Sequence, residues 1–228
     1  MIMIEQILNS FQAMSYWEYI GVALGIAYIF LAMKQSLWCW PVAFVSTSIF
    51  TIMFWQGLLY MESLLNFYYL LMAIYGWWQW RGNKQHSSTQ DVTTDKPSSS
   101  SVYIQKKLIS WSVLTHIKLV FFFALLSLSV GYFWDTSTDA KMPYLDSSTT
   151  IFAIFATYLL TQKVLENWLY WVVIDFASIY LYWQNGYFPS AILFAIYTVL
   201  AWQGFREWRQ QYQHNNDNDG MTVAVGSA

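Results

Sequence analysis

The chain has 228 residues, of which 57% are hydrophobic, 21% are aromatic and only 11% are charged. A soluble domain carries about 25% charged residues, so this composition excludes an ordinary soluble fold and indicates a chain whose main solvent is lipid. The net charge is −2 without a basic block, which excludes a nucleic-acid partner, and the single cysteine excludes an intramolecular disulfide framework.

The N-terminal segment, residues 1–16, is mildly amphipathic and lacks the basic region and cleavage site of a secretory signal. We therefore expect it to remain on the chain as a short interfacial helix. Beyond it, charges mark the edges of apolar runs, because a charge in hydrocarbon costs about 2.5 to 3.5 kcal/mol. Residues 17–81 then hold three membrane-spanning helices, and the polar stretch 82–107 forms a solvated cytoplasmic linker.

Residues 108–134 form a single linking transmembrane helix, residues 148–209 hold three more spans, and residues 210–228 are expected to be a disordered cytoplasmic tail. Gln56-Gly57 and Gln184-Asn185-Gly186 interrupt the apolar pattern where tight hairpins between helices are needed. The sequence thus predicts an all-α integral membrane protein with seven transmembrane helices.

The orientation follows from the distribution of lysine and arginine. Only Lys141 lies on one side of the predicted spans, and Lys118 lies within the fourth. The other side carries Lys34, Arg81, Lys84, Lys96, Lys106, Lys107, Lys163, Arg206 and Arg209. This bias predicts an external N-terminus and a cytoplasmic C-terminus in a bacterial inner membrane.

The two three-helix segments share a template when the chain is shifted on itself by 128 positions without a gap. The matched residues are Trp40 and Trp168, Trp55-Gln56 and Trp183-Gln184, Tyr69 and Tyr197, Gly76 and Gly204, and Trp80-Arg81 and Trp208-Arg209. An even number of spans separates equivalent positions, so both copies face the same way in a 3+1+3 parallel repeat. Transporters use such repeats and hold the substrate near the midplane where the repeats meet.

Asp175 is the sharpest candidate for a functional residue, because it lies near the middle of the sixth span, roughly 12 Å of helix from either end. Trp171, Ser178 and Tyr182 share its helix face. A carboxylate beside an aromatic ring suits an aromatic cation, through charge pairing and cation–π contact. The alternative is a structural ion pair with Lys118. The repeat equivalent of Asp175 is Thr47. We include Thr47 and its neighbour Ser46 among the candidate substrate-binding residues.

The third span adds a polar stripe on an otherwise apolar helix. Its members include Asn66, which must bond either another helix or a ligand, and Tyr69. Tyr197 joins the candidate set as the equivalent of Tyr69. The tryptophans near the cytoplasmic ends of the spans, including Trp80 and Trp208, are expected to be interfacial belt residues. Gly21 and Gly25 form a GxxxG pattern typical of close helix packing.

The sequence predicts neither a cofactor nor a metal site, since no histidine has a second ligand at metal-binding spacing and no nucleotide fingerprint occurs. An enzyme needs at least two convergent catalytic groups at one depth, and only Asp175 qualifies, so we expect no enzyme activity. A substrate-binding membrane subunit and a proton-coupled transporter remain alternatives to a transporter that acts alone by facilitated diffusion.

The run from Val164 to Asp175 and the segment from Ile74 to Trp77 resemble the PnuC-type vitamin transporters, and the resemblance extends over nearly the whole chain. It implies a seven-helix 3+1+3 fold akin to the sugar-transporting SWEET proteins, a homotrimer, and facilitated diffusion of a small vitamin that is later trapped by phosphorylation. Nicotinamide riboside members carry a Trp-x-x-x-Asn motif on the sixth helix. Here Trp171 matches the tryptophan and Asp175 occupies the asparagine position.

The same resemblance places Asn66 at the position of a third-helix amide, commonly a glutamine. The family also contains thiamine transporters of the PnuT type, and thiamine and nicotinamide riboside are both aromatic cations. Replacing an amide by a carboxylate at Asp175 favours a changed ligand. The residues therefore predict uptake of thiamine, with nicotinamide riboside as the alternative.

Overall fold

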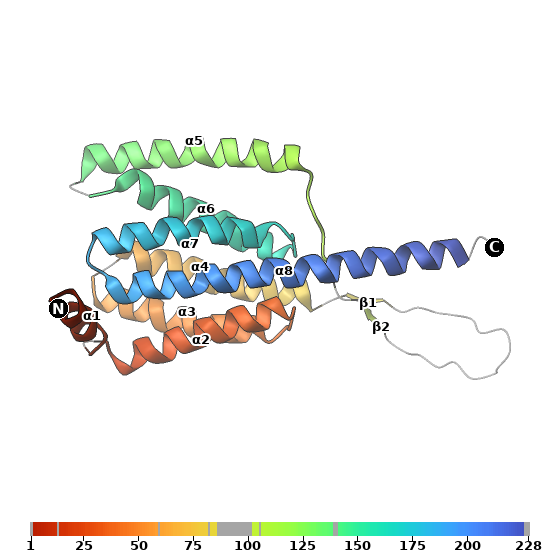
Figure 1. Cartoon of the computed structure of the whole chain (residues 1–228), viewed down its shortest axis with the longest axis horizontal. Coiled ribbons are helices and arrows are strands. Elements are labelled where there is room, and N and C mark those ends of the chain that lie inside the picture. The colour runs from red at the N-terminus through yellow and green to blue at the C-terminus, as the bar shows by residue number, and fades with distance from the viewer. Residues whose placement is uncertain are drawn as a thin grey trace.

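A computed structural model describes residues 2–12, 14–58, 60–81, 83–85, 102–104, 106–138 and 141–225. Within these residues the chain is almost entirely helical, with one short antiparallel strand pair (Figure 1). The elements are α1 (Ile2–Gln12), α2 (Tyr16–Met33), α3 (Cys39–Gln56), α4 (Tyr60–Trp80), β1 (Asn83–Gln85), β2 (Val102–Ile104), α5 (Val113–Ser137), α6 (Pro143–Thr161), α7 (Asn167–Gln184) and α8 (Phe188–Val225).

Local sequence explains where several helices begin. Ser15 caps α2 in a capping box with Glu18, in which each side chain bonds the backbone N–H of the other residue. Ser112 caps α5 by accepting a hydrogen bond from the backbone N–H of Thr115. Pro143 opens α6, where its missing N–H leaves no helical hydrogen bond unmade.

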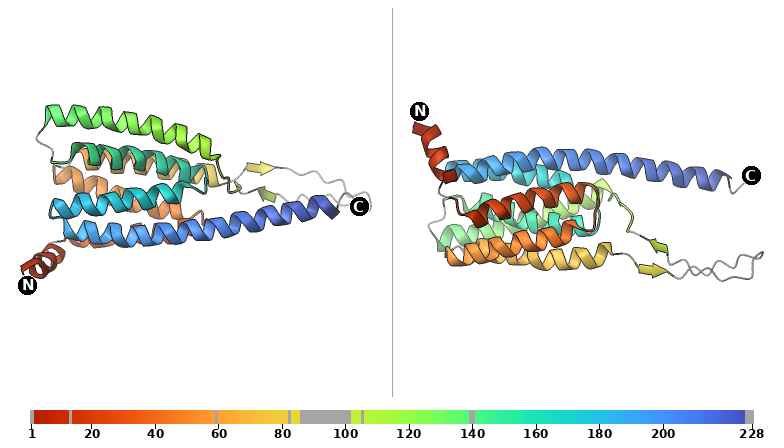
Figure 2. Two further views of the ribbon diagram at one scale, coloured as in Figure 1. Left: turned by 45° about the horizontal axis from the view of Figure 1, so that its top comes forward. Right: turned by 90° about the horizontal axis from the view of Figure 1, so that it is seen from below.

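Helices α2 to α8 lie side by side, and α8 continues beyond the others at the end near β1 and β2 (Figures 1 and 2). Helices α2, α3 and α4 contact one another in sequence, and α6, α7 and α8 do the same. The two groups meet through contacts of α2 with α8 and of α4 with α6, while α5 packs on the outside against α6. By length and composition, α2, α3, α5 and α8 could each cross a membrane.

The two groups have closely matching element bounds. Helix α7 begins and ends 128 positions after α3, and α8 begins 128 positions after α4. The loops match as well, because the non-glycine residues with left-handed backbone after α2 and α6 are Gln35 and Lys163, with φ of 51° and 56°. The hairpins inside each group turn at Leu58 and Gly186, with φ of 60° and 79°.

The helix packing repeats at the same spacing. A Cβ built on Gly76 would lie 2.4 Å from the Trp40 ring, and one built on Gly204 would lie 2.6 Å from the Trp168 ring. Glycine is therefore needed at both positions for an indole to lie against the neighbouring backbone. Trp40 and Trp168 are 2% and 4% exposed, so each closes the interior of its own group.

The final tryptophan of each group bonds the other group. The indole Nε1 of Trp80 donates to the Thr161 carbonyl over 3.1 Å, and that of Trp208 donates to the Met33 carbonyl over 3.0 Å. Trp80 and Trp208 are 3% and 0% exposed. The expectation that these two residues belong to an interfacial belt is therefore wrong, because their N–H groups bond carbonyls at helix ends inside the bundle. Trp202, which the sequence placed in the same belt, is 51% exposed.

The C-terminal segment also differs from the prediction. Helix α8 does not end near residue 209 but continues through Val225, so the prediction of a disordered segment 210–228 is wrong as far as the structure describes it. The residues after Arg206 include Glu207, Arg209, Gln210 and Gln211, which are good helix formers. Most of the predicted linker 82–107 lies outside the described residues, and its described parts include β1 and β2.

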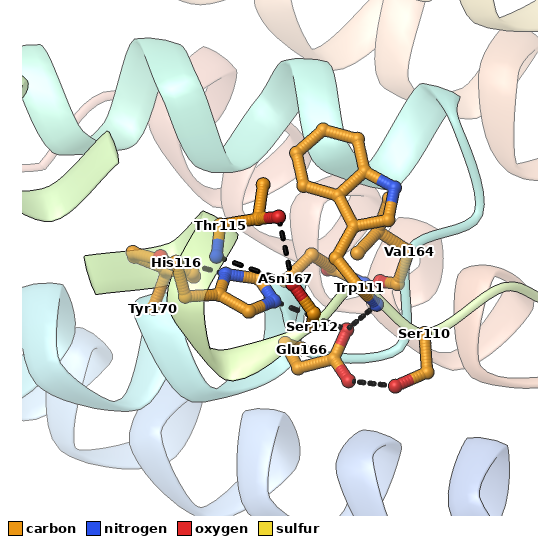
Figure 3. A network of polar contacts seen from close by, with 9 residues as sticks. All are labelled: Ser110, Trp111, Ser112, Thr115, His116, Val164, Glu166, Asn167 and Tyr170. Atoms are coloured by element: carbon orange, nitrogen blue, oxygen red, sulfur yellow. Dashed lines mark hydrogen bonds and ion pairs between the residues drawn. The ribbon is translucent and has the colours of Figure 1, made fainter. Parts of the chain in front are cut away.

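A polar network attaches the beginning of α5 to α7 (Figure 3). Glu166 accepts hydrogen bonds from the Ser110 hydroxyl and, over 3.3 Å, from the backbone N–H of Trp111. Its carboxylate also lies 3.5 Å from Nε2 of His116, whose Nδ1 is 3.0 Å from the Tyr170 hydroxyl. The chain that enters α5 is thus held by side chains near the start of α7.

Candidate functional site

Asp175 lies inside the bundle, eight residues after the start of α7 and nine before its end. Its side chain is 3% exposed. Within the described residues its carboxylate forms no hydrogen bond or ion pair, and the expected alternative partner, Lys118, lies on the exposed side of α5. The structure therefore gives no support to a structural pair of Asp175 with Lys118.

Two tyrosines from opposite groups lie near this carboxylate. Asp175 interacts electrostatically with Tyr69 of α4 and with Tyr197 of α8. These tyrosines are 128 positions apart and come from helices that occupy the same place in each group. The structure therefore brings three predicted residues together, and a phenol hydroxyl from each side accompanies the single carboxylate.

Gly25 of α2 makes room for the Tyr197 hydroxyl. A Cβ on Gly25 would lie 2.8 Å from that oxygen and 3.7 Å from the Ser46 hydroxyl oxygen. Ser46 is 4% exposed and donates over 2.9 Å to the Gly21 carbonyl, which ties α3 to α2. The GxxxG pattern thus serves helix packing at Gly21, and at Gly25 it also admits a tyrosine hydroxyl to the site.

Trp171 and Ser178 lie one turn before and one turn after Asp175. Trp171 is half-buried and packs with Tyr69 around the small core of Ala153, Ala156 and Ile174. Ser178 is 3% exposed. An indole ring, a carboxylate and a hydroxyl therefore follow one another along one face of α7, as the sequence predicted.

The remaining predicted residues have hydrogen bonds that stay inside their own helices. The Thr47 hydroxyl donates to the Ala43 carbonyl over 2.8 Å, and the Asn66 amide donates to the Glu62 carbonyl over 2.9 Å. Both side chains are half-buried. The structure does not join either residue to Asp175, so their place in the site stays a prediction.

Sequence reasoning missed one contribution to this region and placed another residue correctly. Gly25 was interpreted only as a packing residue, although its lack of a side chain also shapes the site. Tyr182, which interacts electrostatically with Tyr69, stacks on Phe194 with ring centroids 5.1 Å apart. Its spacing of seven residues from Asp175 had placed it on the same helix face, because two helical turns return a side chain to that face.

A bundle of long apolar helices around a buried carboxylate and two phenols defines a polytopic membrane protein with an internal polar site. The family model described as nicotinamide mononucleotide transporter matches residues 15–210, and the chain belongs to this family of membrane transporters. The protein is accordingly a transporter and not an enzyme.

Curated relatives agree with this assignment. The chain is 26% identical to the nicotinamide riboside transporter PnuC of Escherichia coli (strain K12) over 204 residues, which covers 86% of this chain and 85% of the relative. It is 27% identical to the riboflavin/roseoflavin transporter RibM of Streptomyces davaonensis over 201 residues, covering 84% and 83%.

A solved structure has the same fold. The crystal structure of the vitamin B3 transporter PnuC matches with a TM-score of 0.67 at 19% identity, covering 93% of this chain and 90% of that chain. The helical bundle described above is therefore a membrane-transporter fold.

Proposed function

We propose that this transporter takes up nicotinamide riboside, a nucleoside whose pyridinium ring carries a positive charge. The observation that carries the proposal is the burial of Asp175 at 3% exposure without a hydrogen-bonded or charged partner in the described part of the chain. A buried unpaired carboxylate is costly, and a cationic substrate that arrives and leaves supplies the missing partner.

The expectation of thiamine as the substrate gains no support from the relatives reported above, whose names speak of nicotinamide riboside or of riboflavin. These names favour the alternative stated in the sequence analysis. Both vitamins are aromatic cations, so the charge of Asp175 does not separate them. We therefore assign the substrate from the relatives. In this proposal Asp175 binds the same ligand through a carboxylate, where the nicotinamide riboside members have an amide.

Riboflavin is a second candidate because one relative is a riboflavin/roseoflavin transporter by name. The flavin ring is uncharged at neutral pH. A neutral ring would leave the Asp175 carboxylate buried beside it without a counter-charge, which disfavours binding. The buried carboxylate therefore favours the cationic nucleoside.

The surrounding groups suit the rest of the nucleoside. Trp171 offers a ring face for the pyridinium, a contact that contributes about 0.5 to 2 kcal/mol. The hydroxyls of Tyr69 and Tyr197 lie near the carboxylate from opposite groups and match the hydroxyls of a ribose. Ser178 and Ser46 complete the proposed site, with Thr47 and Asn66 at its edge.

Substrate choice is tested with purified protein in liposomes. We expect saturable uptake of labelled nicotinamide riboside that excess unlabelled nicotinamide riboside blocks, with weaker competition by thiamine and weaker still by riboflavin. Uptake by this protein alone would also exclude a role limited to substrate binding for another transporter. If thiamine competed best, the nucleoside assignment would fall.

We also infer seven membrane spans, α2 to α8, in a 3+1+3 parallel repeat with α5 as the linking helix. The constant spacing of helix bounds, left-handed loop residues and tryptophan contacts supports this arrangement. The lysine and arginine bias supports an external N-terminus and a cytoplasmic C-terminus in the inner membrane. A reporter fused after Ala228 should then report the cytoplasm, and one inserted at Lys141 should report the exterior.

Transport by facilitated diffusion with later trapping by phosphorylation, in a homotrimer, completes the proposal on the strength of the family resemblance. Liposomes separate this mechanism from proton coupling. Facilitated diffusion predicts equilibration and counterflow without concentration above the external level when a pH gradient is imposed. Native mass spectrometry in detergent should detect three copies of the chain.

A further inference from the structure

Two carboxylates lie at the end of the bundle where α4 and α6 begin and α7 ends (Figure 1). Glu62 lies in the first turn of α4, and Asp146 lies in the first turn of α6. Both side chains are exposed, and their carboxylates interact electrostatically. Among the described residues, no lysine, arginine or histidine forms an ion pair with either one. We call these two residues the outer acidic pair.

Helices α4 and α7 run in opposite directions and place side chains at two levels of the bundle. In α4, Tyr69 follows Glu62 by seven residues, and in α7, Tyr182 follows Asp175 by the same number. Seven residues make two turns, so each pair shares a helix face and is separated by about 10 Å along the axis. Tyr69 interacts electrostatically with Asp175, and Tyr182 does so with both members of the outer acidic pair. The outer acidic pair therefore lies about 10 Å from the level of Asp175.

Tyr182 connects the two levels. Its side chain is half-buried and also interacts electrostatically with Tyr69. Its ring stacks on Phe194, with ring centroids 5.1 Å apart, and meets the Tyr187 ring edge-on at 6.2 Å. Asp175, which is 3% exposed and has no hydrogen-bonded or charged partner in the described part of the chain, lies two turns deeper on the same face of α7. An aromatic group thus lies beside the outer carboxylates, on the helix face that leads to the unpaired inner one.

The carboxylates gather on one side of the bundle. A shift of 128 positions relates Asp175 to Thr47, Glu62 to Ser190 and Asp146 to Glu18. Glu18 is the one carboxylate among these equivalents, and its side chain accepts a hydrogen bond from the backbone N–H of Ser15 in the capping box of α2. The outer acidic pair and Asp175 therefore belong to one arrangement of α4, α6 and α7 that the other half of the bundle lacks.

We propose that Glu62 and Asp146 form an outer binding site that captures an aromatic cation before it reaches Asp175. This site rests on the proposed function for the positive charge of the substrate and adds a second binding position to it. In the proposed topology this end of the bundle faces the exterior, where the substrate arrives. Exposed carboxylates raise the local concentration of a cation and hold it weakly, because water and salt screen them. A cation held here can therefore pass on to Asp175, whose dry surroundings strengthen the charge pair.

Uptake by the full-length protein in liposomes tests the outer site. Initial rates are measured over a range of nicotinamide riboside concentrations, and separately of thiamine as a second aromatic cation, at low salt and at about 1 M salt. The test variant is Glu62→Gln with Asp146→Asn. The control variant, Glu5→Gln with Asp135→Asn, removes two exposed carboxylates outside the outer acidic pair. A third variant, Glu62→Asp with Asp146→Glu, keeps both charges.

At low salt, the test variant should need about 3-fold to 10-fold more cation for half-maximal uptake, with a maximal rate within a factor of about two of the wild type. High salt screens charges beyond about 3 Å, so the difference should disappear there. The control variant and the variant that keeps both charges should behave as the wild type does.

The outcomes separate the outer site from the substrate assignment. An unchanged half-maximal concentration in the test variant, or a change that persists at high salt, would overturn the outer site alone. If the wild type took up thiamine and not nicotinamide riboside, the proposed substrate would fall, and the same comparison with thiamine would still decide the outer site. A wild type that takes up neither cation would overturn both.

Discussion

Replacing Asp175 by asparagine removes the charge of the proposed substrate site while keeping its shape. The carboxylate is 3% exposed and has no hydrogen-bond partner within the described residues, so its bond to a cationic substrate forms in nearly dry surroundings. The pyridinium nitrogen has no hydrogen to donate, so this contact is a charge pair, which contributes about 1.5 to 3 kcal/mol, at the lower end of the range for close charge pairs. The affinity for nicotinamide riboside should therefore fall by about 10-fold to 150-fold.

The same structure predicts the effect on stability, because no internal partner is lost and a buried charge is removed. Asp175→Asn should unfold at a temperature equal to or above that of the wild type. Titration calorimetry of purified protein measures the affinity, and a thermal melt in the same detergent measures the stability. Asp135→Asn, which removes an exposed carboxylate from α5, is the control variant.

A matched pair of ligands makes the test sharper. Reduced nicotinamide riboside keeps the sugar and nearly the same ring, but its ring is uncharged. Asp175→Asn should weaken binding of the oxidised cation and leave binding of the reduced form within a factor of about three, since only the charge contact differs. An equal loss for both ligands, or a lower melting temperature with unchanged affinity, would refute the assignment of Asp175 to the substrate.

Three further predictions concern the frame around the site. Gly204→Ala places a Cβ 2.6 Å from the Trp168 ring, so thermal melts should detect a loss of about 1 to 3 kcal/mol; an unchanged melt would contradict this packing. Trp208→Phe removes the bond to the Met33 carbonyl and should cost about 1 to 3 kcal/mol, measured by denaturant titration against the wild type. Lys163 has a folded-state pKa of about 8, below its ordinary value of 10.5, so the unfolded state binds more protons between these values and stability should rise with pH there. Lys163→Met should abolish this rise, and the same slope in the variant would show that another group causes it.

Much of the fold could be predicted because segments that cross lipid are apolar and the segments between them are polar. Charges and the polar hairpins at Gln56 and Gln184 mark helix ends, and α3 and α7 end at these two residues. The spacing of 128 positions was visible because Trp and Gly are needed where helices approach closely. Asp175 could be identified as a candidate functional residue because a carboxylate in the middle of an apolar run is rare.

Other features depend on contacts between distant segments. Trp80 and Trp208 look like interfacial residues in the sequence, because their neighbours along the chain are polar and the carbonyls that they bond belong to other helices. The role of Gly25 depends on Tyr197, which is 172 positions later in the chain. The length of α8 was missed because hydropathy locates the membrane boundary and not the end of the helix.

The reciprocal bonds of Trp80 and Trp208 make the two three-helix groups depend on each other. A three-helix unit by itself would leave its last indole N–H without an acceptor in apolar surroundings, which costs free energy. Two such units placed face to face supply the acceptor to each other, as the carbonyls of Thr161 and Met33 do here. A symmetric dimer of two separate three-helix units would satisfy both indoles in the same way, whereas one unit alone would satisfy neither.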